Sequence, residues 1–134
     1  MFFKNNKKQK NDLIKIAALL IHAAKIDENF TIEEEKIIEE TLLNLGANKK
    51  NVKQIIIESK KIEDKANQIL EFTKEVKNME ENDKIKIIET LWRIIYSNKD
   101  ADIYETSLMR RLAGLLYIDN KTMGDIKEKI KNNS

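Results

Sequence analysis

Hydrophobic residues recur along the chain at intervals of three and four positions, with polar residues between them. Within residues 13–26 they stand at Leu13, Ile16, Ala17, Leu20 and Ala24, and further hydrophobic residues widen the stripe. This spacing is typical of an amphipathic α-helix, and so wide a stripe predicts a helix at the centre of the core. Six more segments follow the same spacing: 31–46, 48–60, 64–78, 82–97, 102–116 and 120–130. No segment alternates with period two for long enough to form a strand, so we expect an all-α, compact bundle of about seven helices.

The chain also repeats itself at a constant offset between its first and second halves. This offset places the turn and helix start Thr31–Glu34 on Asp102–Glu105, and each of these segments has the spacing of a capping box. It also places Ile14 on Ile85, Ile16 on Ile87, Leu20 on Leu91, Ile37 on Leu108 and Leu45 on Leu116. We therefore predict an internally duplicated helical hairpin, with copies at about 13–45 and 84–116 that superpose in space and are joined by the third and fourth helices.

The composition suits one globular helical domain. The 134 residues suffice to bury a core, because 41% of them are hydrophobic, and the 36% that are charged provide a solvated surface. Proline is absent and glycine occurs only three times, so little in the chain interrupts a helix. We expect a single domain over residues 13–132, preceded by a basic and frayed N-terminal segment, 1–12.

Charge and cysteine content exclude several classes of partner. The 25 basic and 23 acidic residues give a net charge of +2, and the basic run lies in segment 1–12, so we expect no nucleic-acid partner. Contact of this run with an anionic surface is the alternative. The stretch 13–26 includes Lys15, His22 and Lys25, which makes membrane insertion unfavourable. The absence of cysteine excludes disulfides and thiolate chemistry and fits a cytoplasmic location.

Two short acidic turns carry oxygen-bearing side chains at alternate positions. The candidate ligands are Asp27, Asn29 and Glu34 in the first turn, and Asp100, Asp102 and Glu105 in the second. Converging oxygens are what Ca²⁺ or Mg²⁺ requires, so we consider a weak divalent-cation site. Neither turn has the glycine and the bidentate acid of an EF-hand. Two alternatives stay open: the side chains act only as helix caps, or the turns form a contact surface for a protein partner.

Several other residues have a structural explanation, and for some of them a functional alternative exists. His22 is the only histidine and lies within a hydrophobic segment, where a position at the edge of the core is the simplest reading. Trp92 has the helical spacing of a core residue, with a cavity for a hydrophobic ligand as the alternative. Arg110 and Arg111 fit a solvated face, with an anion-binding pair as the alternative.

Leu91-Trp92 and the following residues 97–116 resemble the second repeat of the TerB-like family of tellurite resistance proteins. Residues 26–34 look like its first repeat, and the resemblance extends over about 13–130. The family also resembles the N-terminal domain of DjlA-type co-chaperones. Its motif aspartate is matched by Asp27 but replaced by Asn98, and its glycine is replaced in both copies, whereas its glutamate is matched by Glu34 and Glu105. The resemblance implies a compact helical domain that is linked to stress or tellurite resistance and suspected of metal or ligand binding.

These observations predict a non-enzymatic domain that acts as an interaction or sensing module. A protein partner is expected but not identified, and the oligomeric state stays open. The alternative function is a helical protein–protein adaptor whose acidic turns are only helix caps. An enzyme ranks third, because one histidine without cysteine offers no familiar catalytic set and a metal would have to supply the chemistry.

Overall fold

The computed structural model describes residues 6–25, 30–65, 70–97 and 103–132, and within them the side chains of 10–25, 30–65, 72–97 and 106–132. Seven helices make up these ranges, and no strand occurs in them. They are α1 (Asn6–Ala24), α2 (Ile32–Asn44), α3 (Val52–Lys65), α4 (Leu70–Lys77), α5 (Glu81–Ser97), α6 (Ile103–Leu115) and α7 (Asn120–Asn132). The prediction of a compact all-α fold is confirmed.

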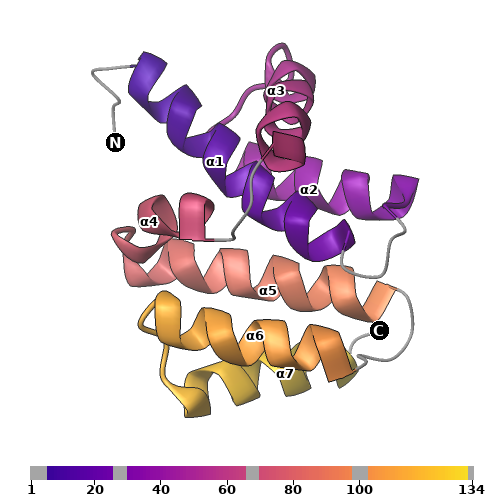
Figure 1. Ribbon diagram of the computed structural model, residues 1–134, viewed down its shortest axis with the longest axis vertical. Helices are drawn as coiled ribbons and strands as arrows, with labels where there is room; N and C mark the ends of the chain where they lie inside the picture. The colour runs from indigo at the N-terminus through magenta and orange to yellow at the C-terminus, as the bar shows by residue number, and fades with distance from the viewer. Residues whose placement is uncertain (1–5, 26–29, 66–69, 98–102, 133–134) are drawn as a thin grey trace.

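Helix α1 lies in the core, as its wide hydrophobic stripe predicts. Every residue from Ala17 to Ile21 has an exposed fraction of 0%, which no helix with one covered face could reach. Four helices contact it, namely α2, α3, α4 and α5. Helix α5 crosses the middle of the molecule, between α1–α3 on one side and α6 and α7 on the other (Figure 1).

Several helix boundaries differ from those expected from the sequence. Helix α1 begins at Asn6, before Leu13, because the lysine and glutamine residues of its first turns are good helix formers that continue a helix already anchored in the core. Helix α3 begins at Val52, after the expected start at Asn48, and it continues to Lys65, so Asp64 belongs to this helix and does not begin the next one. No glycine or proline follows Lys60 to end the helix there.

The predicted offset between the two halves recurs in the helix boundaries. It places the first residue of α2, Ile32, on Ile103, and the last, Asn44, on Leu115, and these are the bounds of α6. Both helices end in a Schellman motif, in which the amide of the second residue beyond the helix cap returns to a carbonyl of the last turn. The Ala47 amide donates to the Leu42 carbonyl at 2.9 Å, and the Ile118 amide donates to the Ala113 carbonyl at 2.9 Å.

The correspondence continues into the third helix of each half. Asn48 and Asp119, which the same offset pairs, both accept a hydrogen bond from the backbone amide three positions further on, at 3.0 Å and 2.7 Å. Helix α3 packs on α1, and α7 packs on α5. The capping contact before the third helix therefore recurs at the same offset, whereas the bounds of these helices do not, because α3 begins at Val52 and α7 at Asn120. Superposition of the two units in space stays a prediction.

The two Schellman motifs differ at the residue that needs a left-handed backbone. Gly46 has a φ of 120° and Tyr117 a φ of 58°. Glycine adopts such angles freely, whereas a side chain there costs about 1 kcal/mol. Tyr117 is 69% exposed and packs little, although the Lys77 ammonium lies 4.9 Å from its ring centre.

We predict that Tyr117→Gly raises the free energy of unfolding by up to about 1 kcal/mol when measured in a Lys77→Gln background, which removes the cation from the ring. Gly46→Ala is the reciprocal change and should lower stability by about 1 kcal/mol. Urea unfolding followed by circular dichroism measures both. A loss of stability in Tyr117→Gly would contradict strain at this position.

Candidate functional site

Glu34 is the predicted cation ligand whose side chain the structure describes. Its backbone amide donates to the Thr31 Oγ1 atom at 3.1 Å, and its Oε1 atom accepts from the Thr31 amide at 2.8 Å. These two bonds form the predicted capping box at the start of α2. The side chain is 1% exposed, so this carboxylate is a buried part of the helix cap.

The other predicted ligands have no described side chains. Asp27, Asn29, Asp100 and Asp102 lie outside the described residues, and Glu105 lies in α6 with its side chain outside them. Within the described part of the chain, no group of three or more acidic, histidine or cysteine side chains is arranged to hold a metal. The cation site and the second capping box therefore stay predictions.

A buried carboxylate that the sequence analysis missed lies at the end of α1. Glu63 of α3 is 8% exposed, and its two oxygens contact two different residues there. The Lys25 Nζ donates to Oε1 at 2.7 Å, and the His22 Nδ1 lies 3.2 Å from Oε2. His22 keeps about a third of its side chain exposed, which confirms its expected position at the edge of the core.

The pairing of Lys25 with Glu63 changes the protonation of the lysine. The hydrogen bond that Lys25 donates to Glu63 is the main cause that raises the pKa of Lys25 above its ordinary value of 10.5, and it outweighs the opposing effect of burial. Because folding raises this pKa, the contact stabilises the fold fully below the ordinary value. The contribution is lost as the pH rises through the higher value in the folded state.

One turn before Glu63, α3 also contacts the beginning of α2. The Lys60 Nζ lies 2.7 Å from the Glu35 Oε1 atom and 5.5 Å from the ring centre of Phe30. Lys60 and Glu63 are three residues apart and so share one side of α3. We call these two residues, with their partners at the end of α1 and on the segment from Phe30 into α2, the α3 clamp. The α3 clamp attaches both chain segments that flank residues 26–29 to a single helix.

The hydrophobic stripe of α3 contains the signal that could have located Glu63. Val52, Ile55 and Ser59 face the core at helical spacing, and Glu63 occupies the next position of the same stripe. A charged residue on such a stripe is expected to be paired, because burying an unpaired charge is costly. The sequence does not say which cation pairs with it.

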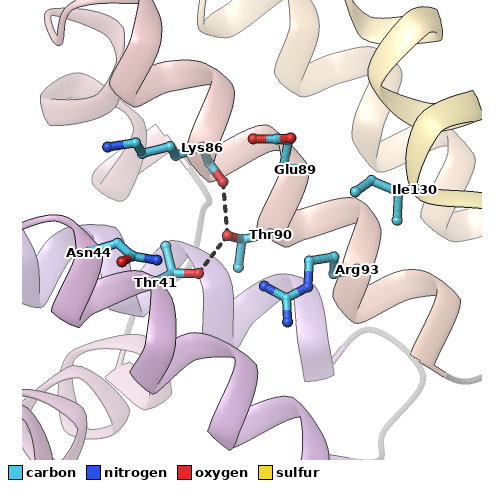
Figure 2. A pocket seen from close by; sticks show the side chains of 7 residues that line it. All are labelled: Thr41, Asn44, Lys86, Glu89, Thr90, Arg93 and Ile130. Atoms are coloured by element: carbon cyan, nitrogen blue, oxygen red, sulfur yellow. Dashed lines mark hydrogen bonds between the residues drawn. The ribbon is translucent and has the colours of Figure 1, made fainter. Parts of the chain in front are cut away.

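A pocket of about 140 Å³ lies between α2, α5 and α7 (Figure 2). Thr41 and Thr90 meet at its base, where their hydroxyl oxygens are 2.6 Å apart. The Thr90 hydroxyl lies 2.8 Å from the Lys86 carbonyl oxygen, and the Thr41 hydroxyl lies 3.1 Å from the Ile37 carbonyl oxygen. Two hydroxyl oxygens this close must have a proton between them, so one threonine donates its hydroxyl proton to the other. The second threonine then donates to its backbone carbonyl.

The charged residues around this pocket connect helices to one another. Arg93 of α5 pairs with Glu40 of α2 at 3.2 Å, and Glu89 of α5 pairs with Lys129 of α7 at 2.9 Å. Polar contacts around the pocket therefore connect α2 and α7 to α5, and Arg93 and Glu89 already form ion pairs. Its geometry favours a structural role.

We predict that Glu63→Gln lowers the free energy of unfolding by about 1 kcal/mol. The variant keeps the shape of the side chain and removes the charge that pairs with Lys25 and His22. The effect stays moderate because both partners are partly exposed and can be hydrated. Urea unfolding near neutral pH measures the change.

Glu58→Gln in the same helix is the matched control. Glu58 is 37% exposed and lies 3.7 Å from the Lys10 Nζ, so its neutralisation should cost less than about 0.5 kcal/mol. Equal losses in the two variants would contradict a special contribution from the α3 clamp.

Comparisons with known proteins place the fold in a family. No described helix is long and apolar enough to cross a membrane. No curated protein and no solved structure matches the chain. The model of a family described as tellurite resistance protein TerB matches residues 13–128, which span α2 to α6 in full and most of α1 and α7. The chain therefore belongs to the TerB family of tellurite resistance proteins.

Proposed function

We propose that this TerB domain is a non-enzymatic interaction or sensing module, whose first acidic turn binds a divalent cation weakly and presents the start of α2 to a protein partner. The candidate ligands are Asp27, Asn29 and Glu34, and the expected ions are Ca²⁺ or Mg²⁺. The family links such a module to tellurite resistance.

The α3 clamp is the observation that carries this proposal. Lys25 immediately precedes residues 26–29 and Phe30 immediately follows them, and both contact α3. A segment with fixed ends loses less conformational freedom when it closes around a ligand, so less of the binding energy is spent on ordering it. The clamp thus supports binding at the first turn.

The second turn has less support than the first, both in the charge of its ligands and in the contacts that fix its ends. The sequence offers the neutral Asn98 where the first turn has the charged Asp27, and cation affinity rises with ligand charge. At its N-terminal side, the described side chain of Ser97 donates to the Ile94 carbonyl of its own helix. The proposal therefore assigns the stronger site to the first turn. Neither turn has the family's glycine, so the expected dissociation constant is about 10⁻⁴–10⁻³ M.

The beginning of α2 is the surface through which the first acidic turn would affect a protein partner. Ile32 follows the capping residue Thr31 directly and is 73% exposed. Glu34 in the same turn is buried, and Ile38, one turn further on, is fully enclosed. Cation binding that orders the acidic turn would therefore change the position of Ile32 at the beginning of α2. This exposed hydrophobic side chain lies next to the enclosed core.

The second candidate function is a helical adaptor whose acidic turns serve only as caps. The capping box at Thr31 and Glu34 favours it, because this carboxylate already has a structural role without any ion. In that case the start of α2 is a permanent contact surface, and divalent cations do not affect it.

A titration with CaCl₂ or MgCl₂, followed by backbone amide shifts, separates the two functions. We predict shifts confined to residues 27–34 in the wild type, with saturation in the millimolar range or below, and their loss in Asp27→Asn. Asp125→Asn is the matched control, because Asp125 is exposed on α7 and lies outside the turn and the α3 clamp, and it should titrate like the wild type.

Equal and diffuse shifts in all three proteins would reflect only the screening of surface charge. That result would refute the cation site and leave the adaptor as the function.

A further inference from the structure

A second pocket, of about 160 Å³, lies between α5, α6 and α7, in the half of the molecule that the proposed function does not use. Its volume is comparable to the roughly 150 Å³ of cavities that accept a benzene-sized molecule. The residues that matter below are Trp92, Met109, Arg110, Met123, Gly124 and Lys127. They bring an aromatic ring, two thioether groups and two cationic side chains to its lining.

Trp92 lines this pocket with a ring that is almost fully buried. The side chain is 2% exposed, and its Nε1 atom is buried without a hydrogen-bond partner within the part of the chain that the structure describes. A buried donor without an acceptor is unfavourable. The indole is otherwise well packed, since it stacks on Tyr96 with ring centres 5.9 Å apart. Because the Nε1 atom is inaccessible to solvent, Trp92 offers a ligand in the pocket its ring and not its N–H group.

The pocket is cationic and has no acidic residue in its lining. Lys127 places its ammonium 5.4 Å from the centre of the Trp92 ring. Arg110 lies on α6 and makes no ion pair with any described residue. Two cations without a carboxylate favour an anionic ligand, while Met109 and Met123 favour contact with an aromatic or aliphatic body.

We propose that this pocket binds a small monocarboxylate with a hydrophobic body about the size of one ring. The body lies against Trp92 and the two methionines, and the carboxylate pairs with Arg110 and Lys127. Inorganic oxyanions lack the hydrophobic body, and neutral aromatic molecules lack the charge. Both should therefore bind more weakly than a carboxylate that has both features.

Trp92 is the single tryptophan of the chain, so its indole N–H gives one assignable signal in a ¹H–¹⁵N spectrum. Titration with sodium benzoate should shift this signal to saturation. Benzamide, which has the same shape without the charge, and inorganic phosphate should each bind at least about fivefold more weakly. Equal binding of benzamide would overturn the anionic part of the proposal, and equal binding of phosphate would overturn the hydrophobic part.

Two of the three glycines supply a matched pair of variants. Gly124 lines the pocket, whereas Gly114 lies on α6 outside its lining, and a side chain at either position meets no atom within 4 Å of its Cβ. Leucine is a better helix former than glycine, so neither variant should fail to fold for backbone reasons. Gly124→Leu should abolish the benzoate-induced shift of the indole signal, while Gly114→Leu should keep it.

A second pair tests the charge. Arg110→Gln should weaken benzoate binding by at least about fivefold, and its neighbour Arg111→Gln, which lies outside the pocket lining, should not. An indole signal that benzoate does not shift, or unchanged binding in Gly124→Leu, would overturn the proposal. Neither result would bear on the cation site, because the readout and the variants lie in the other half of the domain.

Discussion

The structure depends on the need to cover two helices that are hydrophobic on nearly every side. In α1 the residues from Ala17 to Ile21 are completely enclosed, and in α5 residues Ile87, Ile88, Leu91, Ile94 and Ile95 are at most 1% exposed. At roughly 25 cal/mol per Å² of buried apolar surface, this burial is the main force that stabilises the fold. No single partner helix can cover such a surface, so the remaining helices pack around these two.

The polar contacts lie where the covering helices meet the ends and edges of this core. The buried hydroxyl of Ser59 bonds to the Ile14 carbonyl of α1 at 2.9 Å, and Glu63 holds the end of the same helix. The hydroxyls of Thr41 and Thr90 join α2 to α5. Such contacts add little net energy, but each would be costly to break, so they fix how the helices are aligned.

Both candidate sites adjoin a hydrophobic helix whose position the core already fixes. The first acidic turn leaves the end of α1 and is attached to α3 at both ends by the α3 clamp. The pocket of Trp92 lies on the side of α5 that faces α6 and α7, where the indole does not fill the space between the three helices. The two halves that the predicted duplication relates thus differ in the chemistry at their edges.

Much of the fold could be predicted from the sequence because it follows from local rules. The helical spacing in residues 13–26 identifies the central helix, and Thr31 and Glu34 mark the start of the next one. The constant offset between the two halves correctly relates the bounds of α2 and α6. These features depend on neighbouring residues or on a repeat, both of which the sequence displays directly.

The rest depends on partners that are distant in sequence. Glu63 pairs with His22 and Lys25, which lie far before it in the chain, and nothing near it names them. The pocket of Trp92 combines three helices, and the unpaired indole becomes visible only when their packing is known. The left-handed backbone of Tyr117 was equally hidden, because the sequence lacks the glycine that usually marks it.

Native-state hydrogen exchange tests the shared core most directly. If α1 and α5 are the two centres of one core, their slowest amides should exchange with the same opening free energy, equal to the free energy of global unfolding. Amides at the ends of α2 and α6 should open at lower free energy. A clearly lower opening free energy for α5 with α6 and α7 than for α1 would show that the two halves unfold independently, and it would contradict the single core.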